Sequence, residues 1–234
     1  MTTAIGVVVP VHDEEQLLDA CLRSLEIAAR RARLLATVHV VVVLDACTDG
    51  SARIAENYGK SGDFEIVEIA ERNVGRGRAI GMTRVLEHFA SLDRSDLWLA
   101  TTDADSTVPR SWLTDHLALA STGAGAVAGV VRIRPEPPFP LAHFRAFMEF
   151  YDALGDADQH GHVHGANLGV RADAYLAVGG FAPLRTGEDQ ALVQSLRHAN
   201  YDVLATRELE VVTSARLVGR APEGFAQFLA SRFA

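Results

Sequence analysis

The sequence predicts an α/β fold in which helices flank a mostly parallel central sheet. Two observations support this prediction. Five runs rich in β-branched residues are mostly apolar on both faces, as strands inside a sheet are, and helical patterns separate these runs. Strands that alternate with helices form right-handed crossovers and a parallel sheet. We therefore expect a Rossmann-like first half, within a single domain that covers residues 1–234.

The predicted elements follow one another in a regular order. The strand-like runs, all expected to be central strands, cover 5–11, 38–44, 64–70, 97–103 and 125–133. The helical patterns between them cover 14–33, 50–59, 76–90 and 109–121. After residue 133 the alternation ends: a proline-rich stretch at 134–140 precedes a helix at 141–154, whose apolar stripe we expect to pack on the core.

The composition narrows the class of partner. The formal net charge of -8 argues against duplex nucleic acid, because phosphate binding needs a basic surface. The two cysteines, Cys21 and Cys47, imply no disulfide framework, and we expect a reducing, cytoplasmic location. No stretch approaches the roughly 20 apolar residues of a membrane-spanning helix, so any membrane contact is expected to be peripheral.

Polar segments follow four of the predicted strands, at the edge where parallel sheets bind ligands. They cover 10–15, 45–51, 72–78 and 103–107. The last contains Asp103, Ala104 and Asp105. Two carboxylates one residue apart can both point into a cleft, and such oxygen ligands suit a Mg²⁺ or Mn²⁺ ion that bridges a diphosphate. The alternative is a solvated turn with helix capping by Ser106 or Thr107.

The segments after the first two strands carry further carboxylates. Asp45 could accept a hydrogen bond from a base N–H, and Glu14 could bind ribose hydroxyl groups. The alternative is that Asp13, Thr48 and Asp49 cap helices, and we expect capping for Asp49.

Glycines and arginines surround the end of the third strand. Gly75 and Gly77 let the backbone approach a ligand closely, and Arg72, Arg76 and Arg78 are candidates for pairing with phosphate. An exposed turn can have the same composition, so this segment alone is a weak signal.

Gly187, Glu188 and Asp189 open a predicted helix whose N-terminal amides favour negative charge. A carboxylate held beside a reacting hydroxyl group can act as a general base. Simple N-terminal capping is the alternative at this position.

Taken together, these segments resemble the inverting glycosyltransferases of family 2, which have the GT-A fold. The resemblance covers about residues 5–200 and rests on five motifs in a fixed order. The motifs are VVVPVHDEE, VVVLDACTDGS, NVGRGRAIGM, TTDAD and GANLGVRADAYLAVGGF followed by GED. It implies a nucleotide-sugar-binding half at 1–107 and an acceptor and catalytic half at 108–234.

The resemblance also implies roles for particular residues. Asp189 is expected to be the catalytic base, and Asp105, with Asp103, the ligand of a divalent Mn²⁺ or Mg²⁺ ion. The expected donor contacts are Pro10, His12, Glu14, Asp45, Arg76, Asp103, Ala104, Asp105 and Arg216. The expected acceptor contacts are His164, Gly165, Ala166, Asn167 and Glu188.

The implied activity is metal-dependent transfer of one sugar, with inversion, from a UDP- or GDP-sugar to a hydroxyl group of a small molecule, glycolipid or glycan. His12, Leu44 and the pair Ala46-Cys47 depart from the residues usual in the family, which leaves the base open. The sequence after Gln190 lacks the QxxRW motif of processive synthases, which favours single-sugar transfer. The resemblance leaves dimerisation open.

Three other functions compete with this one. His160, His162 and His164 alternate near two aspartates and could bind zinc in a hydrolase. A sugar-nucleotide-binding protein without catalysis would need Asp189 or the acidic pair to be lost, and both are present. A nucleotidyltransferase is expected to have a glycine-rich loop after its first strand, where this chain has VPVHDEE.

Overall fold

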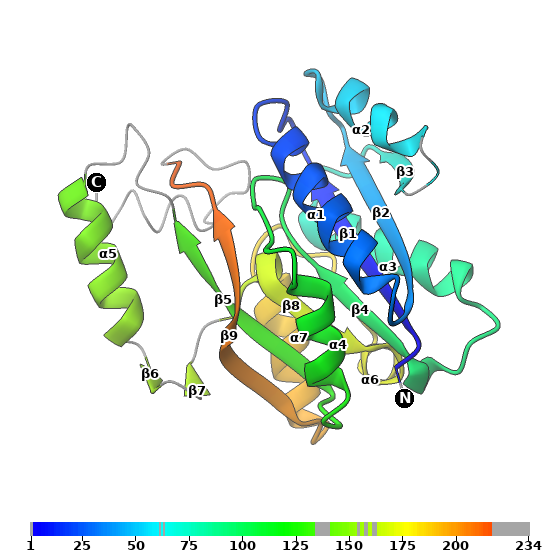
Figure 1. Ribbon diagram of the computed structural model, residues 1–234, viewed down its shortest axis with the longest axis vertical. Coiled ribbons are helices and arrows are strands. Elements are labelled where there is room, and N and C mark those ends of the chain that lie inside the picture. The colour runs from blue at the N-terminus through cyan, green and yellow to red at the C-terminus, as the bar shows by residue number, and fades with distance from the viewer. Residues whose placement is uncertain are drawn as a thin grey trace.

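The computed structural model describes residues 2–60, 62, 64–133, 141–153, 155–156, 159–160 and 163–216. It confirms the α/β fold: a seven-stranded sheet lies between helices in the order β3-β2-β1-β4-β8-β5-β9 (Figure 1). Its strands are β1 (Ala4–Val11), β2 (Thr37–Asp45), β3 (Phe64–Ile69), β4 (Leu97–Thr101), β5 (Ala126–Ile133), β8 (Leu168–Arg171) and β9 (Val203–Thr213). The two-residue strands β6 (Gly155–Asp156) and β7 (Gln159–His160) pair separately.

The sheet is parallel except at one strand. β1 pairs in parallel with β2 and β4, and β3 pairs in parallel with β2. β8 runs antiparallel between β4 and β5, while β9 is parallel to β5. The carboxyl ends of β1, β2 and β4 therefore lie at the same edge, as the polar segments after these strands predict.

The prediction that all five strand-like runs are central is wrong for β3, which forms an edge of the sheet. Its sequence FEIVEI contains two glutamates, and only Phe64 is buried. An edge strand pairs with only one neighbouring strand, and its side chains are more exposed to solvent than those of a central strand. It therefore does not need apolar residues on both faces. Glu65 and Glu68 are compatible with this position and would be costly in the centre of the sheet.

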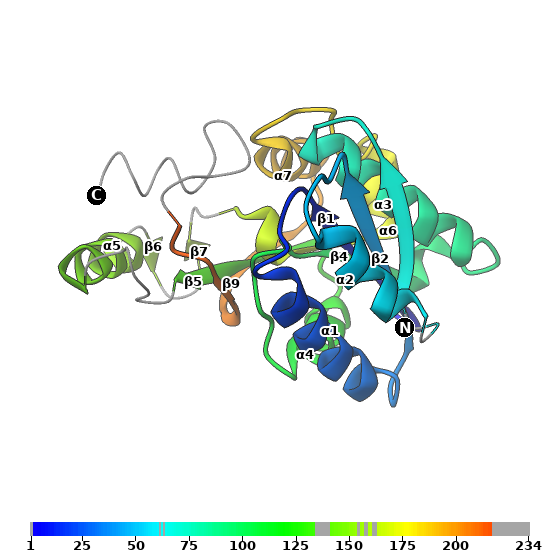
Figure 2. The same ribbon diagram turned by 90° about the horizontal axis from the view of Figure 1, so that it is seen from above.

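Helices cover both faces of the sheet, as the view from above shows (Figure 2). They are α1 (Leu18–Ala32), α2 (Ser51–Gly59), α3 (Val74–His88), α4 (Trp112–Ala120), α5 (Leu141–Ala153), α6 (Ala172–Ala177) and α7 (Glu188–His198). Short 3-10 helices form at η1 (Arg94–Asp96) and η2 (Gly165–Asn167). Residues 14–17, predicted to be helical, form a turn before α1.

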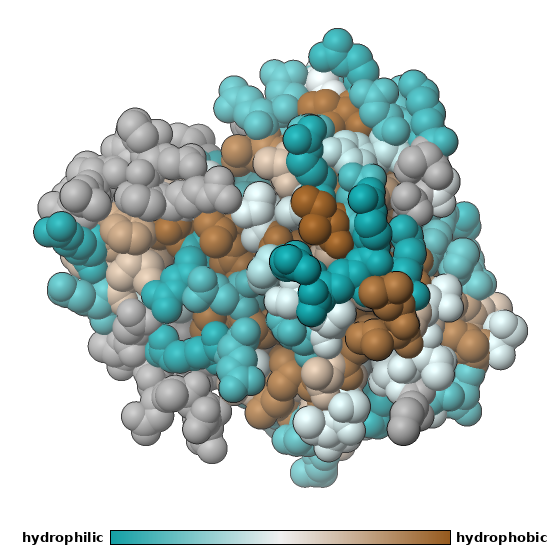
Figure 3. Space-filling model, in the orientation of Figure 1, coloured by the Kyte–Doolittle hydropathy of each residue, from teal (hydrophilic) through white to brown (hydrophobic). Residues whose placement is uncertain are grey.

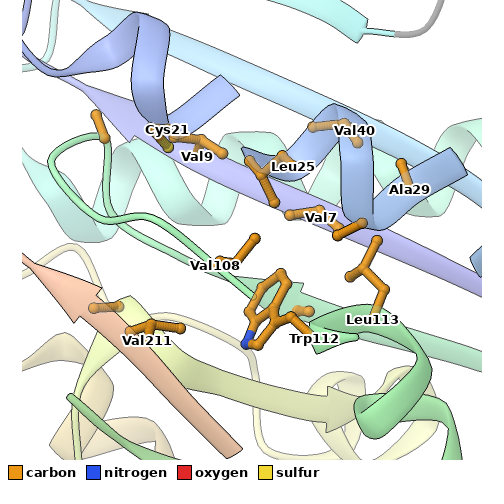
Figure 4. Packing of buried hydrophobic residues seen from close by; sticks show 14 of the residues in the cluster. Val7, Val9, Cys21, Leu25, Ala29, Val40, Val108, Trp112, Leu113 and Val211 are labelled. Carbon is orange, nitrogen blue, oxygen red and sulfur yellow. The ribbon is translucent and has the colours of Figure 1, made fainter. Parts of the chain in front are cut away.

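Alternate strand residues build two hydrophobic clusters. Val7 and Val9 of β1 pack with α1, α2 and α4, whereas Val8 packs with α3, α6 and α7 on the other face. Figure 4 shows Leu25 of α1 and Trp112 of α4 close to the strands in the first cluster. This alternation follows from the two-residue period of a strand.

Helix α3 lies close to β1 because each element has a glycine opposite a valine of the other. A Cβ on Gly81 would lie 2.4 Å from Val8 Cγ1, and one on Gly6 would lie 2.0 Å from Val85 Cγ1. Both distances are too short for real atoms, so glycine is required at these positions. The close approach places the first turns of α3 against the carboxyl end of the sheet.

The surface over α1 is mostly hydrophilic, with hydrophobic residues in separate patches (Figure 3). Large exposed hydrophobic residues in this part of the chain are Ile27, Leu34 and Leu35. Within the described residues, none of the helices combines the length and the apolar composition that crossing a bilayer requires.

Candidate active site

The acidic turn, residues 103–105, follows β4 at the carboxyl edge of the sheet. Its backbone is closed by a hydrogen bond from Ser106 N to Asp103 O at 3.0 Å. Thr107 N then donates to Val212 O at 2.7 Å, which ties the end of β9 to the turn. Residues 105 positions apart in the sequence therefore meet at this point.

Asp103 belongs to a cluster around a buried guanidinium, the Arg78 cluster. Arg78 comes from α3, and its side chain is 3% exposed. Its guanidinium contacts the carboxylates of Asp103 and Glu188, and its Nε donates to Thr101 Oγ1 at 3.2 Å. One arginine thus links the acidic turn to the first residue of α7.

The charged groups of the Arg78 cluster shift one another's pKa values. Burial raises the pKa of Asp103 and of Glu188 above the ordinary range, and Arg78 opposes this rise in both. Burial alone would lower the pKa of Arg78, but Asp103 and Glu188 outweigh it and raise the value. Buried charges of this kind are stable only when each has its partners.

Gly165 of η2 packs directly on the Arg78 guanidinium. A Cβ at this glycine would lie 2.3 Å from Arg78 Nη2. The ring of Phe181 lies on another side, with its centroid 5.9 Å from Arg78 Cζ. Arg78 is therefore enclosed as well as paired.

Asp105 belongs to a second cluster, the Arg216 cluster, which also contains Glu14 and Thr213. Arg216 Nη1 donates to Glu14 Oε1 at 2.5 Å, and Nη2 lies 2.9 Å from Asp105 Oδ2. The other carboxylate oxygen of Asp105 accepts from Thr213 Oγ1 at 3.2 Å. Burial would lower the pKa of Arg216, but Asp105 and Glu14 outweigh it and raise the value.

Asp45 at the end of β2 organises the loop between β3 and α3. Its carboxylate accepts from the backbone N–H groups of Glu71, Arg72 and Asn73 at 2.7, 2.7 and 2.8 Å. These bonds occupy most of its acceptor capacity, and the side chain is buried. Its predicted contact with a base stays a prediction, and loop organisation is the role that the contacts support.

The loops after β1 and β2 are joined by reciprocal hydrogen bonds. Thr48 N donates to Asp13 Oδ1 at 2.6 Å, and Glu15 N donates to Asp49 Oδ2 at 2.9 Å. The N-cap residue of α2 is Gly50 and not Asp49, but the Asp49 carboxylate accepts from the N–H of Ser51, the first residue of the helix. His12 is fixed beside them, with Nδ1 2.6 Å from Asp45 O.

Asp189 is the second residue of α7, where the N-terminal amides favour negative charge. Its Oδ2 accepts from Gly165 N at 2.7 Å. The side chain is only partly buried. Because Gly165 also contacts Arg78, Asp189 and the acidic turn are parts of one connected arrangement.

The predicted acceptor contacts divide into two groups. Asn167 is fully buried, accepts from Trp112 Nε1 at 2.9 Å and donates to the carbonyls of Val130 and Leu209 at 2.8 Å each. It lies beside the irregular pairing of β5 with β9, where the extra residues belong to β9, and its burial disfavours a contact with an acceptor. Glu188 is likewise committed to Arg78.

His164, Gly165 and Ala166 remain at the margin of the site. His164 is half-buried, with Nε2 3.0 Å from the hydroxyl oxygen of Tyr151 on α5. Gly165 and Ala166 are buried, so any contact that they make uses the backbone. Their roles toward an acceptor stay predictions.

Arg76, predicted as a phosphate contact, is exposed and lies 3.6 Å from Glu71. Pro10 adjoins the start of the same helix, since a Cβ on Gly77 would lie 3.6 Å from Pro10 Cβ. Arg78, two positions further on, enters the carboxylate cluster instead. The sequence does contain a signal for it: Arg78 falls on the stripe that Gly81, Met82 and Val85 bury, and a charge on a buried stripe needs a partner.

The zinc alternative rests largely on side chains outside the described residues. His162 and the side chain of His160 are among these, and His164 contacts Tyr151. In the part of the chain that the structure describes, no group of three or more His, Cys, Asp or Glu side chains is arranged to hold a metal ion. A cation at Asp105 would therefore take further ligands from outside these side chains, such as the phosphates of a bound molecule.

A set of loops and carboxylates at the carboxyl edge of this sheet defines the GT-A type of glycosyltransferase fold. A model of the family described as "Glycosyl transferase family 2" matches residues 6–179, and the chain belongs to this family.

Known proteins resemble the chain over different lengths. EpsH of Bacillus subtilis (strain 168), whose name places it among glycosyltransferases, is 27% identical over 99 residues, which are 42% of this chain and 27% of EpsH. The chain thus spans about a quarter of this curated relative.

Two solved structures have similar folds. The mannosyltransferase PcManGT from Pyrobaculum calidifontis, in complex with GDP-Man and Mn²⁺, is 23% identical with a TM-score of 0.67, over 97% of this chain and 68% of that one. S. aureus TarS 1-349 in complex with UDP is 14% identical with a TM-score of 0.67, over 92% of this chain and 61% of that one. At these identities the likeness shows the fold.

Proposed function

We propose that the chain is a metal-dependent, inverting glycosyltransferase that moves one sugar from a UDP- or GDP-sugar to a hydroxyl acceptor in the cytoplasm. One observation carries the proposal: the Arg78 cluster joins the acidic turn to the start of α7, where Asp189 is located. A donor-phosphate region and a candidate base are thus held in one arrangement. Contacts between residues of 1–107 and 108–234 build it, which supports two halves of one domain.

The donor set fits a hard divalent cation such as Mn²⁺ or Mg²⁺. Asp105 and Asp103 offer carboxylate oxygens, and such ions commonly use one or two carboxylates together with substrate phosphates. Bound there, the cation would offset the negative charge on the departing nucleoside diphosphate. PcManGT with GDP-Man and Mn²⁺, and TarS with UDP, support both the ion and the type of donor.

Asp189 is suited to accept the proton of the acceptor hydroxyl group. The backbone N–H groups of Gly165 and Gln190 each donate to one of its carboxylate oxygens at 2.7 Å, which fixes the orientation of the carboxylate. As the acceptor oxygen bonds to the anomeric carbon, the bond from that carbon to the diphosphate oxygen breaks, and the hydroxyl proton passes to Asp189. Attack from the face opposite the leaving group inverts the configuration.

The remaining residues are proposed to position the donor. Glu14, which Arg216 connects to Asp105, is proposed to bind ribose hydroxyl groups. Pro10, His12 and Asp45 are proposed to border the base, and Arg76 to approach the phosphates from α3. His164 and the backbone of Gly165 and Ala166 are the proposed acceptor contacts.

The proposal is tested first by ligand-induced stabilisation. Thermal unfolding is measured with UDP, GDP, UDP-glucose and GDP-mannose, each with and without Mn²⁺. A ligand that binds only the folded state raises its stability, so we expect metal-dependent stabilisation by one base. Stabilisation by Zn²⁺ alone, without any response to nucleotides, would contradict the proposal.

The role of Asp189 is tested by Asp189→Asn, which keeps the shape and removes the basic group. We expect the transfer rate to fall by about 10²–10⁴-fold with little change in nucleotide binding. Asp173→Asn on α6, where the carboxylate pairs with Arg171, is the matched control and should retain the rate. A near-normal rate in Asp189→Asn would exclude this residue as the base.

A further inference from the structure

The Arg216 guanidinium lies where the proposed cation would bind. Its two terminal nitrogens contact the carboxylates of Glu14 and Asp105, at 2.5 and 2.9 Å. Asp105, a proposed ligand of the metal ion, thus already has a cationic partner at Oδ2. A divalent ion and a guanidinium cannot share this oxygen closely, because their charges repel.

Both carboxylates are largely removed from water. The side chains of Glu14 and Asp105 are only 7% and 12% exposed. Buried charges are costly when a positive partner is taken away. Release of Arg216 from Asp105 is therefore favoured when another cation replaces it.

The backbone around Arg216 suits an exchange of partners. Arg216 follows β9, and residues 214–216 belong to no helix or strand. Its Nε is buried and has no hydrogen-bond partner among the described residues, so the guanidinium does not use all of its hydrogen-bond donors in this position. Arg78 differs in this respect, because it is held on a helix by Thr101, Asp103 and Glu188.

We propose that Arg216 closes the cation site until a nucleoside diphosphate arrives, so that the cation and the nucleotide bind only together. The inference rests on the proposed function and specifies how that site is regulated. The ribose hydroxyl groups take over Glu14, the cation takes over Asp105, and the guanidinium of Arg216 pairs with the diphosphate. Asp103 keeps Arg78 throughout, which makes Asp105 the carboxylate that changes partner.

The exchange predicts positive coupling between the two ligands. A cation alone must displace Arg216 without offering it a new anion, so its binding is weak. The diphosphate supplies that anion, and the affinities of cation and nucleotide therefore rise together by the same factor.

The test measures Mn²⁺ binding by calorimetry, without turnover. The variant Arg216→Met keeps most of the side-chain length and removes the charge. We expect it to bind Mn²⁺ about tenfold more tightly than the wild type when no nucleotide is present. We also expect UDP or GDP, whichever binds, to strengthen Mn²⁺ binding less in the variant than in the wild type.

Two further variants make the test specific. Arg132→Met removes another arginine, which lies near the end of β5 and pairs with Glu210 of β9 at 2.8 Å. This variant should leave Mn²⁺ binding unchanged. Arg216→Lys keeps a charge that cannot contact both carboxylates in the same way, and an intermediate affinity is expected. Arg216→Lys also tests the proposal if Arg216→Met does not fold.

The outcomes separate the two proposals. Equal Mn²⁺ affinity in the wild type, Arg216→Met and Arg216→Lys, with wild-type binding of nucleotide and Mn²⁺ together, would overturn the role of Arg216 alone. Failure of all three proteins to bind Mn²⁺, with or without nucleotide, would overturn the metal-dependent function and this inference with it.

Discussion

Two arginines neutralise the carboxylates of the candidate site, and they are held in different ways. Arg78 is 3% exposed, projects from a helix and is enclosed by Gly165 and Phe181. Arg216 is 26% exposed and follows a strand without belonging to another element. The same pairing chemistry thus gives a fixed link in one region and an exchangeable one in the other.

The comparison predicts its largest effect for Arg78→Met. The change leaves Glu188 buried with no positive partner and should lower the free energy of unfolding by about 3–5 kcal/mol. Urea unfolding measures this loss. Arg84→Met, on the exposed side of the same helix, removes pairs with Glu65 and Glu87 and should have almost no effect. Equal losses in the two variants would contradict the role of Arg78 as a fixed link.

The buried imidazole of His116 sharpens the comparison between the two arginines, because it has no charged partner. Burial lowers its pKa to about 3, and its Nδ1 accepts from Trp98 Nε1 at 3.2 Å in the neutral form. Since the folded pKa lies below the unfolded value of 6.5, the stabilisation is complete above pH 6.5 and is lost as the pH falls. We expect this group to reduce stability by about 1.4 kcal/mol per pH unit below that value.

Denaturation of His116→Asn between pH 7 and pH 4 measures this contribution. The amide oxygen can replace Nδ1 as the acceptor for Trp98, and the side chain does not ionise in this range. We expect a smaller loss of stability on acidification than in the wild type. The same pH dependence in both proteins would show that His116 is not the group responsible.

Gly165→Ala tests whether Arg78 can move. The new methyl group would lie 2.3 Å from Arg78 Nη2, and relieving this contact should cost about 1–3 kcal/mol of stability. We also expect slower transfer, because the N–H of Gly165 holds Asp189. Gly77→Ala is the matched control: its nearest new contact is an ordinary 3.6 Å from Pro10 Cβ. Greater stability in Gly165→Ala than in the wild type would indicate a loosely held guanidinium.

The smallest loss is expected for Arg216→Met, about 1–2 kcal/mol, because its cluster is more exposed than that of Arg78. Mn²⁺ should restore part of this stability by binding the released carboxylates. Thermal unfolding with and without Mn²⁺ measures both effects. A loss as large as that of Arg78→Met would remove the distinction between the two clusters.

The sequence predicts the regular part of the fold well. β1, β2 and β4 are apolar on both faces, so local pattern alone identifies them as buried strands. β8 is only four residues long, and its antiparallel place between β4 and β5 depends on contacts from distant segments. Pattern within a short window carries no information about such pairing.

The sequence likewise predicts only part of the candidate site. The carboxylates after β1, β2 and β4 follow from the rule that ligands bind at the carboxyl ends of parallel strands. The contact between Glu14 and Arg216 joins residues 202 positions apart, and no local pattern indicates it. For Asn167 the motif indicates a place in the site, but only the structure shows that Trp112, Val130 and Leu209 use its amide group beside the bulge of β9.

Both edges of the sheet carry charge, and this limits how copies of the chain can associate. Glu65 and Glu68 lie on β3, and Glu208 and Glu210 lie on β9 at the other edge. Arg84 and Arg132 offset part of this charge by pairing with Glu65 and Glu210, and Thr107 already pairs with Val212 of β9. The remaining carboxylates disfavour extension of the sheet by a second copy. Self-association of the folded chain is therefore expected to use helices and not to extend the sheet.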